Sequence, residues 1–230
     1  MMVVPEGGSL YFNNVSMVLD GHTGVEHSIP VPAVYDDIER LWGASSTGYT
    51  PTTIVGYGGL SGEFYFYQHY DVWENEHLLA FTPREQVDAR SRRRLMAAGD
   101  DDWNHILIAR GAKDLYDAGV MTLLGAHGQL EGLGAHWELW MFEQGGMSAM
   151  EALAAGTIMG AQYLGMDGDI GSLEPGKLAD LVVLTANPLD DITHTDDIAQ
   201  VMLGGRLYDA MTLRQVAPVE RAAPVMPWER

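Results

Sequence analysis

Cysteine does not occur in the 230-residue sequence. Its absence excludes a disulfide framework and a thiolate metal centre, so any metal ion would have to be bound by His, Asp or Glu side chains. Positive charge is also scarce, because 13 Lys and Arg residues stand against 32 Asp and Glu residues and leave a net charge of −19. A chain this acidic repels nucleic acid and anionic membrane surfaces. We therefore expect neither of them as a partner.

Long apolar runs are missing as well. No segment approaches the ~20 apolar residues that a transmembrane helix requires, and the amino terminus has no basic stretch leading into an apolar one, as a signal peptide would. The chain opens with an apolar segment, residues 1–4, that is followed at once by a turn, as if the sequence began inside a domain. Because 47% of the residues are hydrophobic, a sizeable core can be buried, and we expect a soluble protein that acts on small molecules.

Short apolar segments alternate with helical stretches along the first two thirds of the chain. Apolar and β-branched residues predict strands at 1–4, 23–27, 52–56 and 120–124. The stretches between and after them predict helices, at 9–19, 34–42, 83–94, 100–118, 135–144 and 148–164. Strands separated by helices favour βαβ units with a parallel sheet. Four such units make half of a β/α barrel, which requires roughly 250 residues when complete.

Two local features refine this reading. The segment 57–81 is rich in aromatic residues and predicts a long loop, a length that is uncommon unless the loop covers a site or is disordered. Its aromatic content argues against disorder, so we expect it to form one wall of a substrate pocket. Ser148 followed by Glu151 matches a capping box and predicts the start of a helix.

The pattern changes after residue 170. Residues 171–184 predict a turn followed by a strand, and 198–208, with Gly204 and Gly205 at its centre, predict a β-hairpin. The proline-containing stretch that follows predicts an irregular tail. The sequence thus divides into three expected parts, a half-barrel at 1–168, β-sandwich strands at 169–217 and a tail at 218–230.

One run of residues in this region is highly specific. Gly-Ser-Leu-Glu-Pro-Gly-Lys-Leu-Ala-Asp-Leu-Val-Val-Leu at 171–184, then Asn-Pro-Leu at 187–189 and Val-Met-Leu-Gly-Gly-Arg-Leu-Tyr at 201–208, resembles the carboxyl-terminal signature of the amidohydrolase superfamily. Residues 148–165 are similar to the helix that precedes this signature, although Met159 stands where the family has Asn. The resemblance covers nearly the whole chain and is strongest to the amidohydrolases fused to TolB-like propellers, which are commonly exported.

The resemblance implies a divalent metal, Zn²⁺, with one or two ions in a full-length enzyme. The family holds its metal with a His-x-His pair on strand one, a Lys or Glu on strand four, His on strands five and six, and Asp on strand eight. The first strand of this chain would match strand five, and no His-x-His spacing occurs anywhere in the sequence. The resemblance therefore implies a chain that lacks the amino-terminal half of the enzyme, and that half is its expected partner.

Two histidines are the main candidates for the site. His27 ends the segment that would match strand six, at the carboxyl end where barrel active sites are built, and the resemblance implies that it is a metal ligand. His127, in the sequence Gly-Ala-His at 125–127, stands where the family has Gly-Thr-Asp. An imidazole can bind zinc or act as a general base near neutral pH, so we expect His127 to be both a ligand and the catalytic base. Val4 falls where the strand-five His would lie and cannot bind metal.

Four further residues form a second group of candidates, in the second shell or at the substrate: His22, His136, Glu138 and His69. Each has a plain structural alternative, since a histidine can order a turn, face solvent at a helix terminus or lie on the surface. The three consecutive aspartates at 100–102 are explained by the helix macrodipole, and the basic cluster at 90–94 by internal ion pairs.

These observations predict a hydrolase that acts on carbon–nitrogen bonds of small amide-type substrates, present as an N-terminally truncated fragment. A non-catalytic, metal-free domain is the alternative, favoured by the missing His-x-His pair, and a prolidase-like dipeptidase is a second enzymatic alternative. Half a barrel leaves sheet edges unpaired, and exposed edges invite association, so we also expect the chain on its own to form homo-oligomers or to be poorly soluble.

Overall fold

Four parallel segments lie side by side and form the framework of the first half of the molecule. A computed structural model describes residues 1–92 and 97–226. Strands β1 (Gly24–Glu26) and β2 (Gly48–Thr50) pair in parallel, and single parallel bridges add the segment at Glu6 beside β1 and the segment at Thr122 beside β2. The spatial order of the four segments follows their order in the chain. This is the strand arrangement of a partial β/α barrel, and it confirms the predicted fold class.

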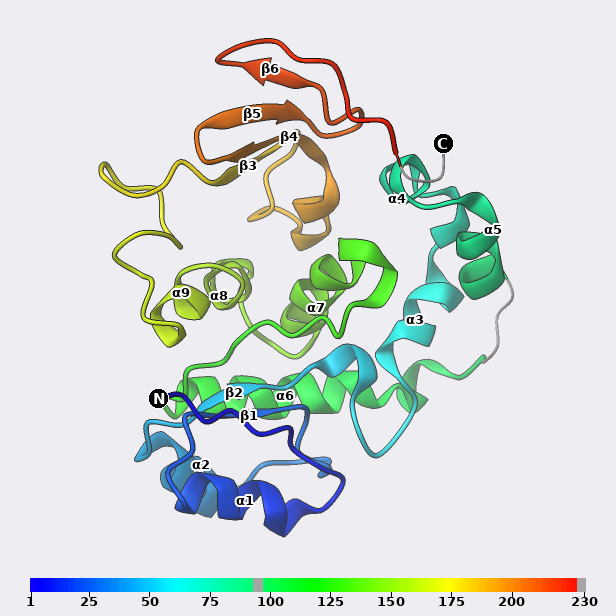
Figure 1. Cartoon of the computed structure of the whole chain (residues 1–230). Coiled ribbons are helices and arrows are strands. Elements are labelled where there is room, and N and C mark those ends of the chain that lie inside the picture. Colours follow the sequence, from blue (N-terminus) through cyan, green and yellow to red (C-terminus); the bar gives the residue numbers. More distant parts are fainter. Residues whose placement is uncertain (93–96, 227–230) are drawn as a thin grey trace.

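Helices connect the parallel segments, because parallel neighbours require crossover connections. Figure 1 shows α1 and α2 on one side of β1 and β2, with the long α6 running beside the same strands. The helices before the fourth segment are α1 (Tyr11–Leu19), α2 (Asp36–Gly43), α3 (Gly62–His69), α4 (Glu76–Phe81), α5 (Arg84–Val87) and α6 (Asn104–Asp117). Those after it are α7 (Leu133–Gln144), α8 (Ala149–Ala155) and α9 (Ile158–Tyr163). Short 3₁₀ or π turns lie at Thr53–Val55, Val72–Glu74, Asp88–Arg92, Asp100–Asp102, Gln129–Gly132 and Ile192–Asp196.

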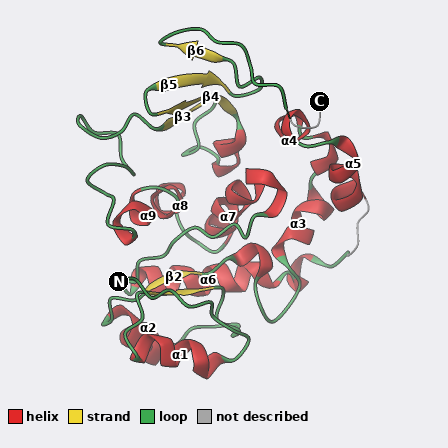
Figure 2. Ribbon diagram, in the orientation of Figure 1, coloured by secondary structure: helices red, strands yellow, loops and turns green. Residues whose placement is uncertain are grey.

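An antiparallel sheet forms the second half, at the opposite end of the molecule from β1 and β2 (Figures 1 and 2). Its order is β3-β4-β5-β6, with β3 at Leu181–Leu184, β4 at Ile198–Leu203, β5 at Arg206–Asp209 and β6 at Gln215–Ala217. The predicted hairpin is confirmed, since β4 and β5 are joined by Gly204 and Gly205, which have φ of 54° and 75°. Positive φ at both central residues gives a turn whose twist matches the strands. The boundary expected at residue 168 stays a prediction.

The capping box that the sequence predicts at α8 is present. The Ser148 hydroxyl accepts a hydrogen bond from the backbone N–H of Glu151, whose carboxylate accepts one from the N–H of Ser148. The helix is shorter than expected, however. It ends at Ala155, and a new helix, α9, begins two residues beyond Gly156, because Thr157 has a non-helical φ of −133° and ψ of −95°.

The aromatic segment 57–81 is largely helical, so the prediction of a loop there is wrong. Within α3 the buried residues are spaced at i, i+3 and i+4, which is the helical repeat. Phe66 is fully buried and stacks on Trp137 of α7 with ring centroids 4.5 Å apart. The aromatic residues thus build the larger hydrophobic core between α3 and α7, and a run of four consecutive aromatics hid the periodicity.

Strand positions in the first half also differ from expectation. The predicted strand at 52–56 is a 3₁₀ turn at Thr53–Val55, and β2 lies before it. The segment at 120–124 makes only the single bridge at Thr122, and the parallel bridge of the first segment is at Glu6 rather than within residues 1–4. The helices expected at 83–94 and 100–118 are each preceded or followed by a short 3₁₀ or π turn, and residues 93–94 lie outside the described residues.

The last helix of the first half lies directly against the parallel strands. A Cβ atom on Gly24 of β1 would overlap the phenol oxygen of Tyr163, and one on Gly48 of β2 would lie 2.7 Å from its ring. The absence of side chains at two adjacent strand positions therefore makes the room in which Tyr163 of α9 packs. Burial raises the pKa of Tyr163 to about 12, so the phenol is neutral at physiological pH.

Candidate active site

Three parallel segments end in left-handed backbone at the same edge of the sheet. His27 follows β1 with φ of 70°, Thr52 follows β2 with φ of 50°, and His127 follows the fourth segment with φ of 50°. Of the five non-glycine residues with positive φ in the described chain, these three line one hollow of about 340 Å³. Left-handed backbone costs an L-residue about 1–2 kcal/mol, and such strain gathers at functional sites. The carboxyl edge of the strands is therefore the candidate active site.

The two predicted histidines meet in this hollow. Their ring centroids lie 5.4 Å apart at an interplanar angle of 66°. His27 is 8% exposed and its Nε2 lies 2.9 Å from the Glu6 carboxylate, whereas its Nδ1 is buried without a hydrogen-bond partner among the described residues. His127 is exposed. The structure therefore brings the two candidate rings together, and the roles assigned to them stay predictions.

Gln129 sets the orientation of the His127 ring. With its amide nitrogen turned toward the backbone, the two N–H groups of Gln129 lie near three acceptors, the carbonyls of Ala126 at 3.2 Å and of His127 at 2.8 Å and Nδ1 of His127 at 3.2 Å. The Gln129 side chain therefore ties the His127 ring to its own turn.

Two carboxylates and a threonine complete the hollow, and the sequence analysis did not single them out. Glu6 is largely exposed and faces His27, and Glu26 ends β1 beside it. Burial raises the pKa of Glu26, against a hydrogen bond from Thr50 and the neighbouring His27, which lower it. Glu6, Glu26 and Thr52 could have been found from their place at strand ends. Pro5, next to Glu6, and the strand wrongly predicted at 52–56 made those strand ends hard to recognise.

Glu138, on helix α7, supports this edge from outside the hollow. It is completely buried and accepts hydrogen bonds from the backbone N–H groups of Thr53 at 2.7 Å and Ile54 at 3.1 Å. Burial raises the pKa of Glu138 to about 8, although these hydrogen bonds act to lower it. Glu138 therefore anchors the turn that follows Thr52, and it does not line the hollow with the two histidines.

The other three predicted residues lie elsewhere. His22 precedes β1, and its carbonyl accepts a hydrogen bond from the Thr47 hydroxyl at 2.7 Å, which orders the turn at the amino end of the strand. His69 ends α3 and stacks on Tyr65 with centroids 4.1 Å apart. His136 lines a second cavity that has no residue in common with the hollow of His27 and His127.

The described residues do not form a complete metal centre. Among residues 1–92 and 97–226, no group of three or more His, Asp or Glu side chains is placed to hold a metal ion. A catalytic zinc takes three protein ligands. This edge has two imidazoles and the carboxylates of Glu6 and Glu26, but Glu6 is paired with His27 and these groups are not arranged around one ion. The chain alone thus does not supply the ligand set of the metal that the resemblance implies.

Comparison with known proteins shows which family the chain resembles. The sequence model of the amidohydrolase family matches residues 97–208, slightly less than half of the chain. The structure extends this likeness to the fold of most of the chain.

Individual proteins and structures are also similar to parts of this chain. Imidazolonepropionase of Symbiobacterium thermophilum is 55% identical over 40 residues, which are 17% of this chain and 9% of that protein. Guanine deaminase of Escherichia coli is 41% identical over 69 residues, 29% of this chain and 15% of the enzyme. A Xaa-Pro dipeptidase structure with bound methionine has a TM-score of 0.60 at 23% identity and covers 91% of this chain.

The chain covers less than half of each of these relatives. The chain spans 45% of the dipeptidase, so it corresponds to about half of such a fold. At 23% identity the dipeptidase shows the fold alone. Within the part of the chain that the structure describes, no helix has the length and apolar content needed to cross a membrane.

Proposed function

We propose that this chain is the carboxyl-terminal half of the catalytic domain of an amidohydrolase that hydrolyses a carbon–nitrogen bond in a small amide-type substrate. The observation that carries the proposal is the meeting of His27 and His127 on strained strand ends at one edge of a parallel sheet. Residues at the carboxyl ends of barrel strands are the ones that perform chemistry in this fold. The names of the sequence relatives, a guanine deaminase and an imidazolonepropionase, agree with bonds of this type.

The two imidazoles have different surroundings and therefore different proposed roles. His127 is exposed, so water and substrate can reach its ring, and it is the group that accepts a proton from the attacking water and passes it to the leaving nitrogen. His27 is held by Glu6 and is nearly buried, so it orients groups at the reacting centre.

The proposal includes a second half that this sequence does not contain. The chain spans 45% of the dipeptidase fold, and the described residues lack a three-ligand metal group. We propose that the remaining ligands of a divalent ion, Zn²⁺ by the superfamily's general use of such ions, come from that half. The substrate would then bind between the two halves, above the hollow lined by His27, Thr52 and His127.

The test uses the full-length parent protein. It is assayed against a panel of N-acyl amino acids, Xaa-Pro dipeptides, aminopurines and an imidazolone, with His127→Ala and His27→Ala compared with the matched control His194→Ala, whose ring bonds the carbonyl of Asn187 on the surface. We expect each site variant to lose at least about 100-fold in kcat/KM and the control to keep the parental value. Activity that survives both site substitutions would refute the proposed roles.

Two other functions are separated by the same experiment. A prolidase-like dipeptidase is favoured by the fold match to the Xaa-Pro dipeptidase, and it requires that the Xaa-Pro dipeptides be the substrates turned over. A non-catalytic domain is favoured by the lack of a three-ligand group among the described residues. That alternative requires a parent protein that purifies without stoichiometric metal and turns over no member of the panel.

A further inference from the structure

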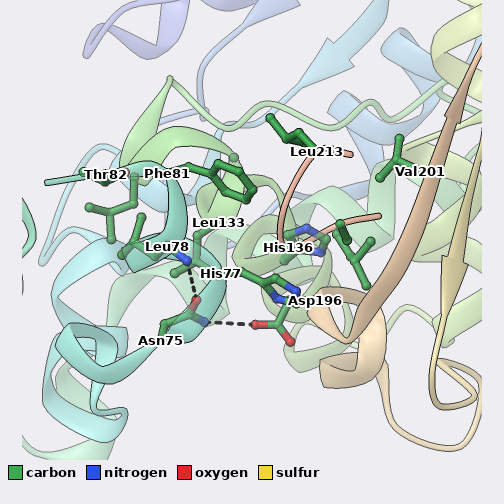
Figure 3. A pocket seen from close by; sticks show the side chains of 14 residues that line it. Asn75, His77, Leu78, Phe81, Thr82, Leu133, His136, Asp196, Val201 and Leu213 are labelled. Carbon is green, nitrogen blue, oxygen red and sulfur yellow. Dashed lines mark hydrogen bonds between the residues drawn. The ribbon is translucent and has the colours of Figure 1, made fainter. Parts of the chain in front are cut away.

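A second cavity lies between the two halves of the molecule. It holds about 250 Å³, the space of roughly eight water molecules, and residues of α4, α7 and β4 line it together with the turn before β4 and the loop after β5 (Figure 3). None of its lining residues lines the hollow of His27 and His127. A ligand in this cavity would therefore not touch the candidate active site.

Polar groups gather at one end of the cavity. Figure 3 shows His77, His136 and Asp196 close together beside Asn75. The Asn75 amide donates to the Asp196 carboxylate at 3.5 Å, and its oxygen accepts from the N–H of Leu78 as the cap of α4. Asn75 is therefore fixed by the helix, and it holds the carboxylate in place. Nδ1 of His136 is buried and has no hydrogen-bond partner among the described residues.

The charges of this end favour a cation over an anion. Asp196 supplies a carboxylate, and no Lys or Arg occurs among the described lining residues. Burial, with a smaller contribution from His77, lowers the pKa of His136 to about 4, so its ring is neutral at physiological pH and offers an acceptor nitrogen. Burial and Asp197 raise the pKa of Asp196, and His77 acts to lower it. A ligand cation beside Asp196 would further stabilise the carboxylate.

The rest of the wall is mostly apolar and suits an organic group better than a bare ion. It consists of Leu78, Phe81, Leu130, Leu133, Ile198, Val201, Ala210 and Leu213, with Thr82 and Gly132. His77, His136 and Asp196 do not form a group that could hold a metal within the described residues. An apolar wall of this extent stabilises an organic group, since apolar surface removed from water is favourable.

We propose that this cavity binds a primary ammonium compound that carries a small apolar group, with the ammonium donating to Asp196 and His136. The three N–H donors of an ammonium group match the acceptors at the polar end. The apolar group then contacts apolar lining residues such as Phe81, Leu133 and Val201. This site is separate from the proposed catalytic edge and does not depend on it.

The experiment compares three probes of similar shape on the unaltered chain by titration calorimetry. They are phenethylammonium, 2-phenylethanol and 3-phenylpropionate. We expect phenethylammonium to bind with a Kd of about 1 mM or tighter and at least about tenfold more tightly than the other two, because only it forms a charge-assisted hydrogen bond with the carboxylate. Equal binding of the propionate, or no binding of the ammonium, would overturn the proposal without reference to any variant.

A substitution and its matched control locate the site. Asp196→Asn should weaken phenethylammonium binding at least about tenfold, whereas Asp197→Asn removes the same charge next door and should leave binding unchanged. In histidine side-chain ¹H–¹⁵N spectra the ligand should shift the ring nitrogens of His77 and His136 and leave those of His27 and His127 in place. Shifts confined to His27 and His127 would mean that the probe occupies the catalytic edge, and this result would contradict the inference while leaving the proposed function standing.

Discussion

Two pairs of histidines in this chain illustrate different ways of placing imidazole rings. His27 and His127 sit on strained, left-handed backbone at strand ends and share their hollow with two carboxylates. His77 and His136 belong to α4 and α7 and lie among apolar side chains beside Asp196. The first pair is positioned by backbone conformation and the second by helix packing. We therefore expect the first region to respond to changes in its supporting backbone and the second to changes in burial.

Helix α7 serves both regions. Glu138 reaches the turn after Thr52, and His136, two residues earlier, lines the second cavity. Residues two apart on a helix point to different sides, so one helix can contribute to both sites. Substitutions at these two positions consequently test the comparison within a single element.

The largest effect is expected from Glu138→Ala. It leaves the buried N–H groups of Thr53 and Ile54 without an acceptor, and unpaired buried donors of this kind cost about 1–3 kcal/mol each. We expect the free energy of unfolding, measured by urea denaturation, to fall by about 3 kcal/mol. Glu143→Ala, on the exposed side of the same helix, should change it by less than about 0.5 kcal/mol. Equal effects of the two variants would show that the carboxylate does not anchor the turn.

Gly125→Ala should disturb the packing of the strand ends around His27 and His127. The added Cβ would lie 2.6 Å from both the Thr50 methyl group and the Thr52 hydroxyl, so the two strand ends would have to separate. Overpacking of this kind typically costs about 1–3 kcal/mol. The thermal midpoint should therefore fall, while Gly168→Ala, where no atom lies within 4 Å of the new Cβ, should leave it unchanged. A Gly125 variant as stable as the control would mean that this edge is not tightly packed.

The two regions should give opposite slopes of stability against pH. The pKa of Glu138 is raised from 4.5 to about 8, so the native state holds the extra proton in this window and its stabilisation, complete below pH 4.5, is lost as the pH rises through 8. The decline is up to about 1.4 kcal/mol per pH unit. The pKa of His136 is lowered from 6.5 to about 4, so its contribution is present above pH 6.5 and is lost as the pH falls through 4.

Urea denaturation at a series of pH values checks these slopes. Glu138→Gln should flatten the decline between pH 4.5 and 8, and His136→Gln should flatten the loss below pH 6.5. Each substitution serves as the control for the other, because they lie on the same helix. If either variant kept both slopes of the parent chain, the assignment of that slope to its residue would be wrong.

The smallest effect is expected at Thr52. Its φ of 50° strains a β-branched residue, so Thr52→Gly should relieve about 1 kcal/mol of strain, partly offset by the greater freedom of glycine in the unfolded chain. Thr50→Gly, within the extended strand β2, gains no such relief and should lower the free energy of unfolding by about 1 kcal/mol. A similar loss in both variants would argue that the left-handed backbone at Thr52 is not strained.

Features encoded by nearby residues could be predicted from the sequence. The hairpin between β4 and β5 follows from Gly204 and Gly205, and the start of α8 follows from Ser148 and Glu151. The alternation of strands and helices predicted the parallel arrangement, because crossover connections leave few other choices. For the hairpin and the helix start, the determining residues lie within a few positions of the structure that they specify.

Features that depend on distant residues could not be predicted. The segment at 53–55 has the composition of a strand, but Glu138, 85 positions from Thr53 in the chain, accepts the hydrogen bonds that a strand would offer to a neighbour. For the site, the place of His27 and His127 followed from strand ends, whereas Glu6 became visible only with its parallel bridge to Glu26. Tertiary contacts thus decided what local propensity left open.

The packing of Tyr163 against two glycines has a consequence for how the chain holds together. Because the phenol ring fills the space left by Gly24 and Gly48, a helix more than 100 residues later in the chain packs directly against β1 and β2. Cleavage by a protease between α8 and α9 would release that ring and expose bare strand backbone to water. Helix α9 thus holds β1 and β2 in place, and its loss should expose the backbone at Gly24 and Gly48 first.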